Sequence, residues 1–368
     1  MSKKINMLLA LFAVTINTHN VIAGENTVFG LHVADNVEQM QKIINQLTTT
    51  KDFDAQKTIG LFDEDNTLVY RYGPEVGNGD MKQWANLAKT VLCSGENKNS
   101  YIKKWKQIYY RNHIKLQVDP KLPEFVTGLQ EKGVRCAIIT SKMNEDLGID
   151  SDGRRLNMHA ICDQEHKNFK LDFRIGWHNL APTKLNLKSK CPWPDFIDGV
   201  IYADRATKVN TYKDHNKVIA LHKFLGYAGL SHEAKNLNTI IAIDDRMSEI
   251  KALGEYAAQH NYYFIGIIFT GYKNLPQPPK FDATYEQKRL EHLVQCEEWL
   301  LPQGSDAFYK DENGVWHLKE KTTSFIDSTM QSSESDVICK FSKPQGKMDL
   351  KGDKSLCTLK QRPCEVTP

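Results

Sequence analysis

Acidic residues gather where a short apolar stretch of the chain ends. Residues 58–62 read TIGLF, and three acids, Asp63, Glu64 and Asp65, follow them directly. Like charges packed at a strand end are unfavourable unless something cationic compensates them. Carboxylate oxygens are the ligands that Mg2+ prefers, and carboxylates also act as nucleophiles and acid–base groups. The spacing therefore indicates a site that binds a cation or carries out chemistry.

Other polar side chains stand at similar places further along the chain. Thr140 follows the apolar run VRCAII, and Asp244 and Asp245 follow the run TIIAI. Lys217 opens a helical pattern between them. Each feature alone is also explained by a helix cap or a satisfied backbone group. Because ligands collect at the carboxyl ends of strands in open α/β sheets, three strands that end this way indicate a single site.

Strands and helices alternate along the chain and must position these side chains. Short continuous apolar strands between helices are typical of a parallel sheet that is covered on both faces. The predicted fold class is α/β, a Rossmann-like three-layer parallel sheet. Helices are predicted at about residues 36–47, 80–93, 100–112, 122–132, 216–225, 247–260 and 286–300, and strands at about 58–62, 134–139, 239–243 and 262–269.

The order of these motifs resembles the haloacid dehalogenase-like (HAD-like) superfamily of phosphohydrolases. The resemblance spans about residues 57–270, and the stretches FDEDNTL and GNGDMKQW further resemble a bacterial family of exported proteins of uncharacterised function. One residue departs from the pattern: Glu64 stands where the superfamily has an apolar residue, and it is expected to add negative charge beside the site. The four motifs are matched by Asp63, Asp65 and Thr67, by Thr140, by Lys217, and by Asp244 with Asp245.

The resemblance implies a role for each matched residue. Asp63 is expected to attack phosphorus and form an aspartyl-phosphate, and Asp65 to protonate the leaving oxygen and then activate water. Thr140 would hydrogen bond a phosphoryl oxygen, and Lys217 would hold the attacking carboxylate and the phosphate, with Lys213 as the alternative lysine. The implied cofactor is Mg2+, held by Asp63, Asp65 through its backbone carbonyl, Asp244 and Asp245.

The predicted function is that of a Mg2+-dependent phosphatase, a phosphoric monoester hydrolase that acts on a small phosphorylated substrate. Two alternatives stay open: a catalytically weak HAD-like binding or effector protein, and a phosphotransferase that delivers the phosphoryl group to an acceptor other than water. The formal net charge of +3 is too near neutral to favour nucleic acid or an anionic membrane as a partner. The sequence identifies no protein partner.

Two long intervals between the motifs predict inserts in a core that extends over residues 24–302. Both intervals are far longer than the roughly 30 residues that a βαβ unit needs. Cap inserts are therefore predicted at about residues 71–119 and 146–212. Aromatic residues of the first insert, such as Trp84, are expected to roof the site and select the substrate, and the alternative is that both inserts are surface elaborations. Arg246 is expected to be a surface charge rather than an anion ligand.

The two ends of the chain differ from this core. Residues 1–23 combine a basic start, a short apolar run and a small residue at the end, which predicts a cleaved signal peptide and an exported, periplasmic or secreted protein. A buried N-terminal helix is the alternative, and no stable membrane anchor is expected because the run is too short. Residues 303–368 are predicted to be a polar, cysteine-containing extension with a hairpin at Asn313-Gly314.

Export would place the eight cysteines in an oxidising compartment, where some of them should pair. None forms a C-x-x-C pair, so a zinc site is poorly supported. Cys136 lies inside a predicted strand and is expected to be a core thiol. A disulfide is predicted between Cys162 and Cys191, where it would stabilise the second insert by about 3–4 kcal/mol. The other six are Cys93, Cys136, Cys296, Cys339, Cys357 and Cys364.

Overall fold

The structure of the protein is a computed structural model that describes most of the chain. Several sequence predictions lie outside the described part: the signal peptide at residues 1–23, Lys213, Cys191, and the extension beyond residue 319. The described residues are 29–49, 53–74, 81–92, 106–149, 153–185, 193–203, 215–230 and 236–319.

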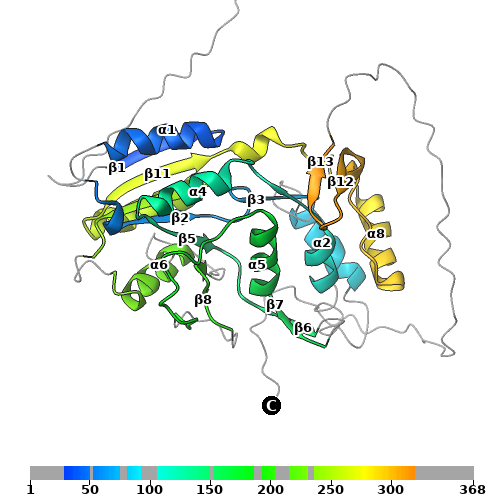
Figure 1. Ribbon diagram of the computed structural model, residues 1–368. Helices are drawn as coiled ribbons and strands as arrows, with labels where there is room; N and C mark the ends of the chain where they lie inside the picture. The colour runs from blue at the N-terminus through cyan, green and yellow to red at the C-terminus, as the bar shows by residue number, and fades with distance from the viewer. Residues whose placement is uncertain are drawn as a thin grey trace, which may run out of the picture.

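A mostly parallel sheet of seven strands forms the centre of the molecule (Figure 1). Its strands are β1 (Phe29–Ala34), β2 (Thr58–Phe62), β5 (Arg135–Thr140), β8 (Phe196–Ile197), β9 (Val200–Tyr202), β10 (Thr239–Asp244) and β11 (Tyr263–Phe269). Their spatial order is β1-β11-β10-β2-β5-β9-β8, and every neighbouring pair is parallel except β8 with β9. The predicted α/β class with a largely parallel sheet is confirmed.

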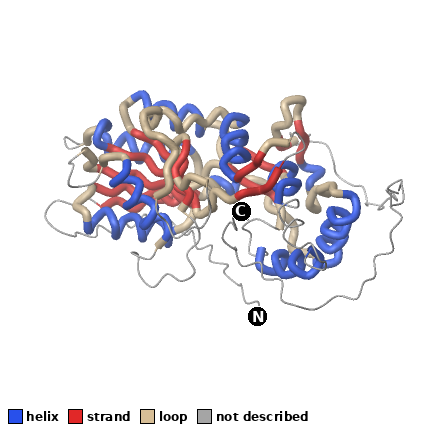
Figure 2. Tube along the Cα trace, turned by 90° about the horizontal axis from the view of Figure 1, so that it is seen from below, coloured by secondary structure: helices blue, strands red, loops and turns tan. Residues whose placement is uncertain are grey.

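Helices cover both faces of this sheet and complete three layers. Along β2 the side chains alternate between the two faces, so Phe62 belongs to one hydrophobic core and Leu61 to the other. Figure 2 shows the sheet between its two helical layers. The first core includes α1 (Val37–Thr48), α4 (Leu122–Glu131) and α5 (Met158–Asn168), and the second includes α6 (Asn216–Tyr227) and α7 (Met247–Gln259).

The chain between β2 and β5 leaves the sheet and forms the first insert. Its base is an antiparallel pair, β3 (Val69–Tyr72) and β4 (Ile114–Gln117). Between these strands lie α2 (Met81–Leu92) and a second helix that is described over residues 106–112. α2 packs on α8 (Ala283–Cys296) in a separate hydrophobic core, and Figure 1 shows the two helices side by side at one end of the molecule. The first insert therefore packs against α8, the last α-helix that the structure describes.

The second expected insert, at residues 146–212, is described in part, over residues 146–149, 153–185 and 193–203. Within these residues a hairpin, β6 (Asp146–Ile149) with β7 (Arg155–Asn157), forms a sheet of its own. Other described residues of this range supply a covering helix, α5, and the strands β8 and β9 of the large sheet. These strands are too short for an apolar pattern to reveal them. Their connecting turn, Asp198-Gly199, has φ values of 51° and 80°, and such an Asp-Gly pair is a strong hairpin signal.

The predicted Cys162–Cys191 disulfide is wrong, because Cys162 is a free thiol. The prediction assumed an insert without much core. Instead α5 places Cys162 at 0% exposure in the same hydrophobic core as the sheet, and burial raises the pKa of its thiol well above the ordinary value. Cys136 on β5 is a buried free thiol, as predicted.

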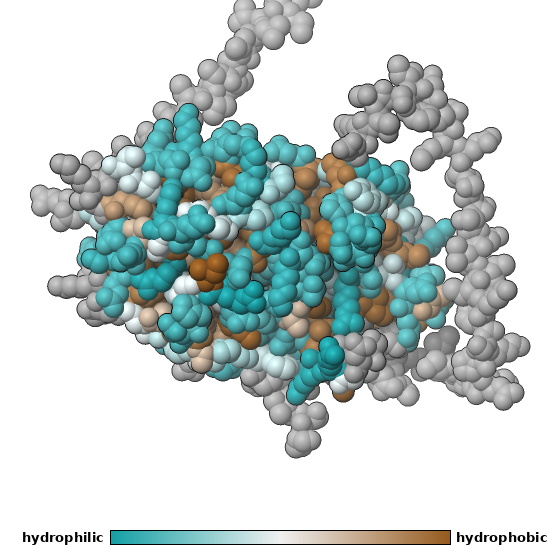
Figure 3. Space-filling model, viewed as in Figure 1, coloured by the Kyte–Doolittle hydropathy of each residue, from teal (hydrophilic) through white to brown (hydrophobic). Residues whose placement is uncertain are grey.

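The described part of the C-terminal extension forms the predicted hairpin. β12 (Phe308–Lys310) and β13 (Trp316–Leu318) pair antiparallel on either side of Asn313-Gly314. On the face shown in Figure 3, hydrophilic residues predominate and the hydrophobic ones lie in small separate patches. Among the described helices, none combines the length and the apolar character that crossing a membrane requires.

Candidate active site

The predicted side chains at three strand ends meet at one edge of the central sheet. β2 lies between β10 and β5, and the three strands are parallel, so their carboxyl ends share an edge. Asp63 follows β2, Thr140 ends β5 and Asp244 ends β10. From β2 the chain first builds the sheet towards β9 and then crosses back to build it towards β11. Such a change of direction opens the crevice where α/β sheets bind ligands.

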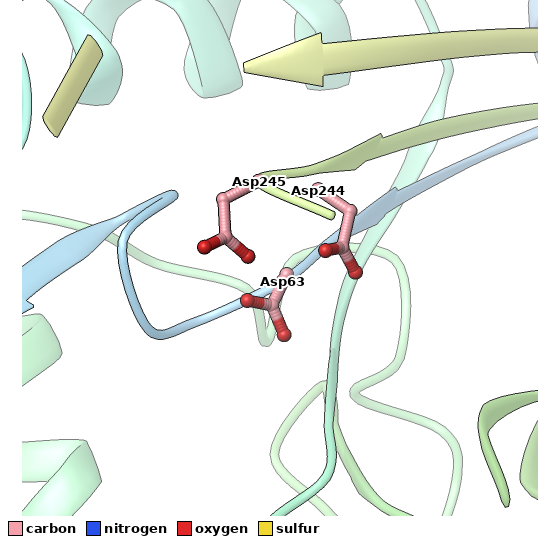
Figure 4. A group of neighbouring side chains, drawn as sticks. All are labelled: Asp63, Asp244 and Asp245. Atoms are coloured by element: carbon pink, nitrogen blue, oxygen red, sulfur yellow. The ribbon is translucent and has the colours of Figure 1, made fainter. Parts of the chain in front are cut away.

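Asp63, Asp244 and Asp245 form a cluster of carboxylates, which we call the aspartate cluster (Figure 4). Each contributes one oxygen, and these oxygens all lie within 4.8 Å of one another. Asp63 is fixed by its backbone, whose N–H donates to the carbonyl of Ile243 over 2.8 Å. Asp63 and Asp244 are each 2% exposed. Three converging hard oxygen ligands suit a divalent cation such as Mg2+.

Lys217 joins the aspartate cluster from the first turn of α6. Its Nζ lies 2.5 Å from Asp63 Oδ1 and 2.6 Å from Asp244 Oδ2, and its side chain is fully buried. Burial alone would lower the pKa of Lys217, but the two carboxylates raise it above its ordinary value. The lysine is therefore charged and bridges two strand ends. It holds the position that the sequence predicted for it.

The aspartate cluster carries more negative charge than Lys217 neutralises. Burial raises the pKa of Asp63 to about 6 although Lys217 opposes the rise. Burial likewise raises the pKa of Asp244 to about 6, with a further contribution from the neighbouring charge of Asp245. Oδ2 of Asp63 is buried and has no hydrogen-bond partner among the described residues. A divalent cation would supply both the missing charge and the missing partner, so the residues present fit Mg2+.

The turn after β2 also positions Asp245. Asn66 has a φ of 64°, in the left-handed region that asparagine adopts more readily than most residues. Its side-chain amide donates to Asp245 Oδ2 over 3.1 Å. The N–H groups of Leu68 and Val69 both donate to the carbonyl of Glu64 and close the turn. The sequence analysis gave Asn66 no role, although a residue type that tolerates positive φ was its local signal.

Asp65 does not belong to the aspartate cluster. Among the described residues, the acids placed to hold a metal are Asp63, Asp244 and Asp245, and Asp65 is not one of them. Its side chain is 44% exposed and forms ion pairs with Arg71 and Lys142, with a distance of 2.9 Å from Lys142 Nζ to Asp65 Oδ1. The residue expected to transfer protons is thus held by two cations that the sequence analysis did not single out.

The structure corrects the expected effect of Glu64. Its carboxylate is fully buried and contacts Lys142 Nζ at 2.8 Å and Arg71 Nη2 at 3.4 Å. Burial alone would raise the pKa of Glu64, but Lys142 and Arg71 hold it well below its usual range. Lys142 and Arg71 therefore compensate the negative charge of Glu64, which is not an added charge beside the aspartate cluster.

The burial and contacts of two further predicted residues, Thr140 and Arg246, differ from each other. Thr140 is 2% exposed, and its hydroxyl accepts a hydrogen bond from the backbone N–H of Lys142 over 3.3 Å. Arg246 is half-exposed and lies 3.6 Å from Asp245 and 3.7 Å from Glu249. Thr140 is thus buried at the sheet edge, whereas Arg246 fits the expected surface charge.

Three aromatic residues in or next to the described part of the first insert are buried in hydrophobic cores. Tyr70 and Tyr72 are buried in the main hydrophobic core, and their hydroxyls donate to the carbonyls of Pro276 and Gln303. Trp84 is buried between α2 and α8. These side chains fix the first insert against the C-terminal part of the chain, because large aromatic surfaces are stabilised by burial.

No protein-family model matches the chain, and a comparison with curated proteins finds no match.

Proposed function

We propose that this protein is a Mg2+-dependent phosphohydrolase with the HAD-like form of the α/β fold, acting on phosphate monoesters. The observation that carries the proposal is the contact of one buried lysine, Lys217, with both Asp63 and Asp244. A carboxylate that attacks a phosphate must overcome the repulsion of two anions. Lys217 and a divalent cation on the aspartate cluster would together lower that repulsion.

The proposed reaction has two steps that share one nucleophile. First, a carboxylate oxygen of Asp63 attacks phosphorus, the ester P–O bond breaks, and the leaving oxygen takes a proton from Asp65. Next, Asp65 removes a proton from water, the resulting hydroxide attacks phosphorus, and the bond between Asp63 and phosphorus breaks to release inorganic phosphate. Thr140 would donate its hydroxyl to a phosphoryl oxygen. When bound, Mg2+ would neutralise charge on the phosphoryl group.

One observation favours the alternative of a binding protein with little activity. Asp65 forms ion pairs with Arg71 and Lys142, and its carboxylate is not among the oxygens of the aspartate cluster, so a protein without turnover could make the same contacts. Proton transfer requires Asp65 to lie within about 3 Å of the leaving oxygen. A binding protein would keep the phosphate contacts of Lys217 and Thr140 and would lack turnover.

Phosphate release by the purified protein with Mg2+, measured on a panel of phosphomonoesters, tests this proposal. Asp63→Asn preserves the shape of the side chain and removes its attacking charge, so turnover should fall by several orders of magnitude while the fold survives. Asp163→Asn, at a partly buried position of α5 outside the aspartate cluster, serves as the matched control and should keep its activity. Activity of Asp63→Asn close to that of the unaltered protein would refute the mechanism. Transfer to added alcohols in place of phosphate release would identify a phosphotransferase.

A further inference from the structure

A buried network of charges lies beside the aspartate cluster and takes no part in it. Glu64 is at its centre, and two cations, Arg71 and Lys142, each contact both Glu64 and Asp65. Glu64 has an exposure of 0%, Arg71 of 4% and Lys142 of 14%. Consecutive acids, one buried and one half-exposed, therefore share the same two cations.

Arg71 is held from its other side by a second pair of residues. Its Nη2 lies 2.5 Å from Glu165 Oε2 on α5, and Lys115 Nζ lies 2.6 Å from Glu165 Oε1. Arg71 and Lys115 are opposite each other in the β3–β4 register. Two like charges at such positions destabilise a hairpin unless an anion lies between them, and Glu165 is that anion. The guanidinium is thus fixed by contacts from the turn after β2 and from α5.

The charges of this network balance without a ligand. Three acids, Glu64, Asp65 and Glu165, face three cations, Arg71, Lys115 and Lys142. His166 lies 3.7 Å from Glu64, and burial lowers its pKa, so it adds no positive charge at neutral pH. Among the described residues, the network has no surplus cation to recruit an anionic substrate. Asp65 is the most exposed member, so any effect of the network on chemistry passes through it.

We propose that Arg71 and Lys142 are positioning residues that hold the Asp65 carboxylate for proton transfer, and that Glu64 is the buried anchor that holds both cations. The inference rests on the proposed function, since it assigns a task to the acid–base group of that reaction. Contacts to two cations restrict a carboxylate far more than one contact does, and a misplacement of about 1 Å in a reacting group can reduce rates about 100-fold. The arrangement also explains why an acid occupies position 64.

Lys142→Met tests the proposal, because it removes one of the two contacts and leaves Glu64 paired with Arg71. The readout is kcat/KM on two esters, p-nitrophenyl phosphate and an alkyl phosphate such as ethyl phosphate, because kcat/KM reports the step in which the leaving group departs, whereas the later hydrolysis of the aspartyl-phosphate is the same for both. Nitrophenolate leaves without a proton, whereas an alkoxide needs one, and general acid assistance contributes about 10²- to 10⁴-fold. We expect kcat/KM on the alkyl ester to fall at least about tenfold further than kcat/KM on the aryl ester.

Three comparisons separate positioning from a structural role. Lys142→Arg, which keeps the charge, should restore the ratio between the two esters. Lys106→Met is the matched control, because Lys106 is a partly buried lysine that pairs with Glu145 at 2.5 Å outside this network. It should leave the ratio unchanged. If Lys142→Met does not fold, the charge-balanced variant Glu64→Gln/Lys142→Met replaces it and should show the same bias against the alkyl ester.

Each outcome bears on a different claim. A loss of kcat/KM of equal size on both esters would overturn the positioning role even though the protein is a phosphatase. An unaltered protein that hydrolyses neither ester with Mg2+ would refute the proposed function itself, and the inference would fail with it. A bias against the alkyl ester that Lys142→Arg corrects would support the proposal.

Discussion

Replacing one aspartate of the cluster should stabilise the protein when no metal is bound. In Asp244→Asn the amide keeps the shape of the carboxyl group and cannot ionise. The pKa of Asp244 is about 6 in the folded protein against an ordinary value of 3.8. The folded state therefore binds its proton more tightly than the unfolded state does. The stability that this provides is fully present below pH 3.8 and is lost as the pH rises through about 6.

The size of the effect follows from that difference in pKa. A rise from 3.8 to about 6 corresponds to about 3 kcal/mol of stability lost at pH 7. Asn resembles the protonated acid, so Asp244→Asn should escape this loss. We expect the variant to be more stable than the unaltered protein by about 3 kcal/mol near neutral pH, and to match it near the ordinary pKa of the acid.

Urea denaturation with a chelator, near pH 4 and near pH 7, measures this difference. Asp163→Asn is the control and should change stability by less than about 0.5 kcal/mol at both values. Millimolar Mg2+ should reverse the order at neutral pH, because the unaltered protein gains a bound cation and the variant lacks one ligand. An effect of Asp244→Asn that is the same at both pH values would refute the claim that uncompensated buried charge strains this site.

Three other substitutions or reactions probe separate features of the fold. Lys217→Met leaves two buried carboxylates without their cation and should destabilise the chelated protein by about 3–5 kcal/mol in urea at neutral pH, whereas Lys223→Met, on the exposed side of the same helix, should have little effect. Gly199→Ala should cost at least about 2 kcal/mol in thermal denaturation, because its φ is +80° and a Cβ would lie 2.1 Å from a backbone oxygen. The control Gly128→Ala, in open space on α4, should instead stabilise by about 1 kcal/mol. Cys162 should react with iodoacetamide only after unfolding, and recovery of a disulfide-linked Cys162 peptide would contradict the structure.

The parts of the fold that the sequence predicted well are the strands buried on both faces. β2, β5, β10 and β11 are continuous apolar runs, because side chains on either side of the strand enter a hydrophobic core. β1 was missed because it lies at the edge of the sheet, where Val33 is 62% exposed and a histidine interrupts the run. β9 was missed because three residues do not establish a pattern.

The candidate site also has one part that the sequence could predict and one part that it could not. The aspartate cluster was predictable because each of its acids directly follows an apolar strand, and parallel strands bring such positions together. The network around Glu64 was not predictable. Arg71, Lys115, Lys142 and Glu165 come from different elements and carry no local signature, since an isolated charge in a sequence most often lies in solvent. Only the tertiary structure shows that these charges are buried together.

The contact between the first insert and α8 has a consequence for how the fold is completed during synthesis. The indole N–H of Trp84 donates to Glu286 Oε2, across 202 positions of sequence. The apolar face of α2 therefore leaves the ribosome long before α8 exists to cover it. A contact of such long range forms slowly, and uncovered apolar surface attracts other chains and chaperones in the meantime. The first insert is thus synthesised early, but the hydrophobic core that it shares with α8 is completed only after α8 has been made.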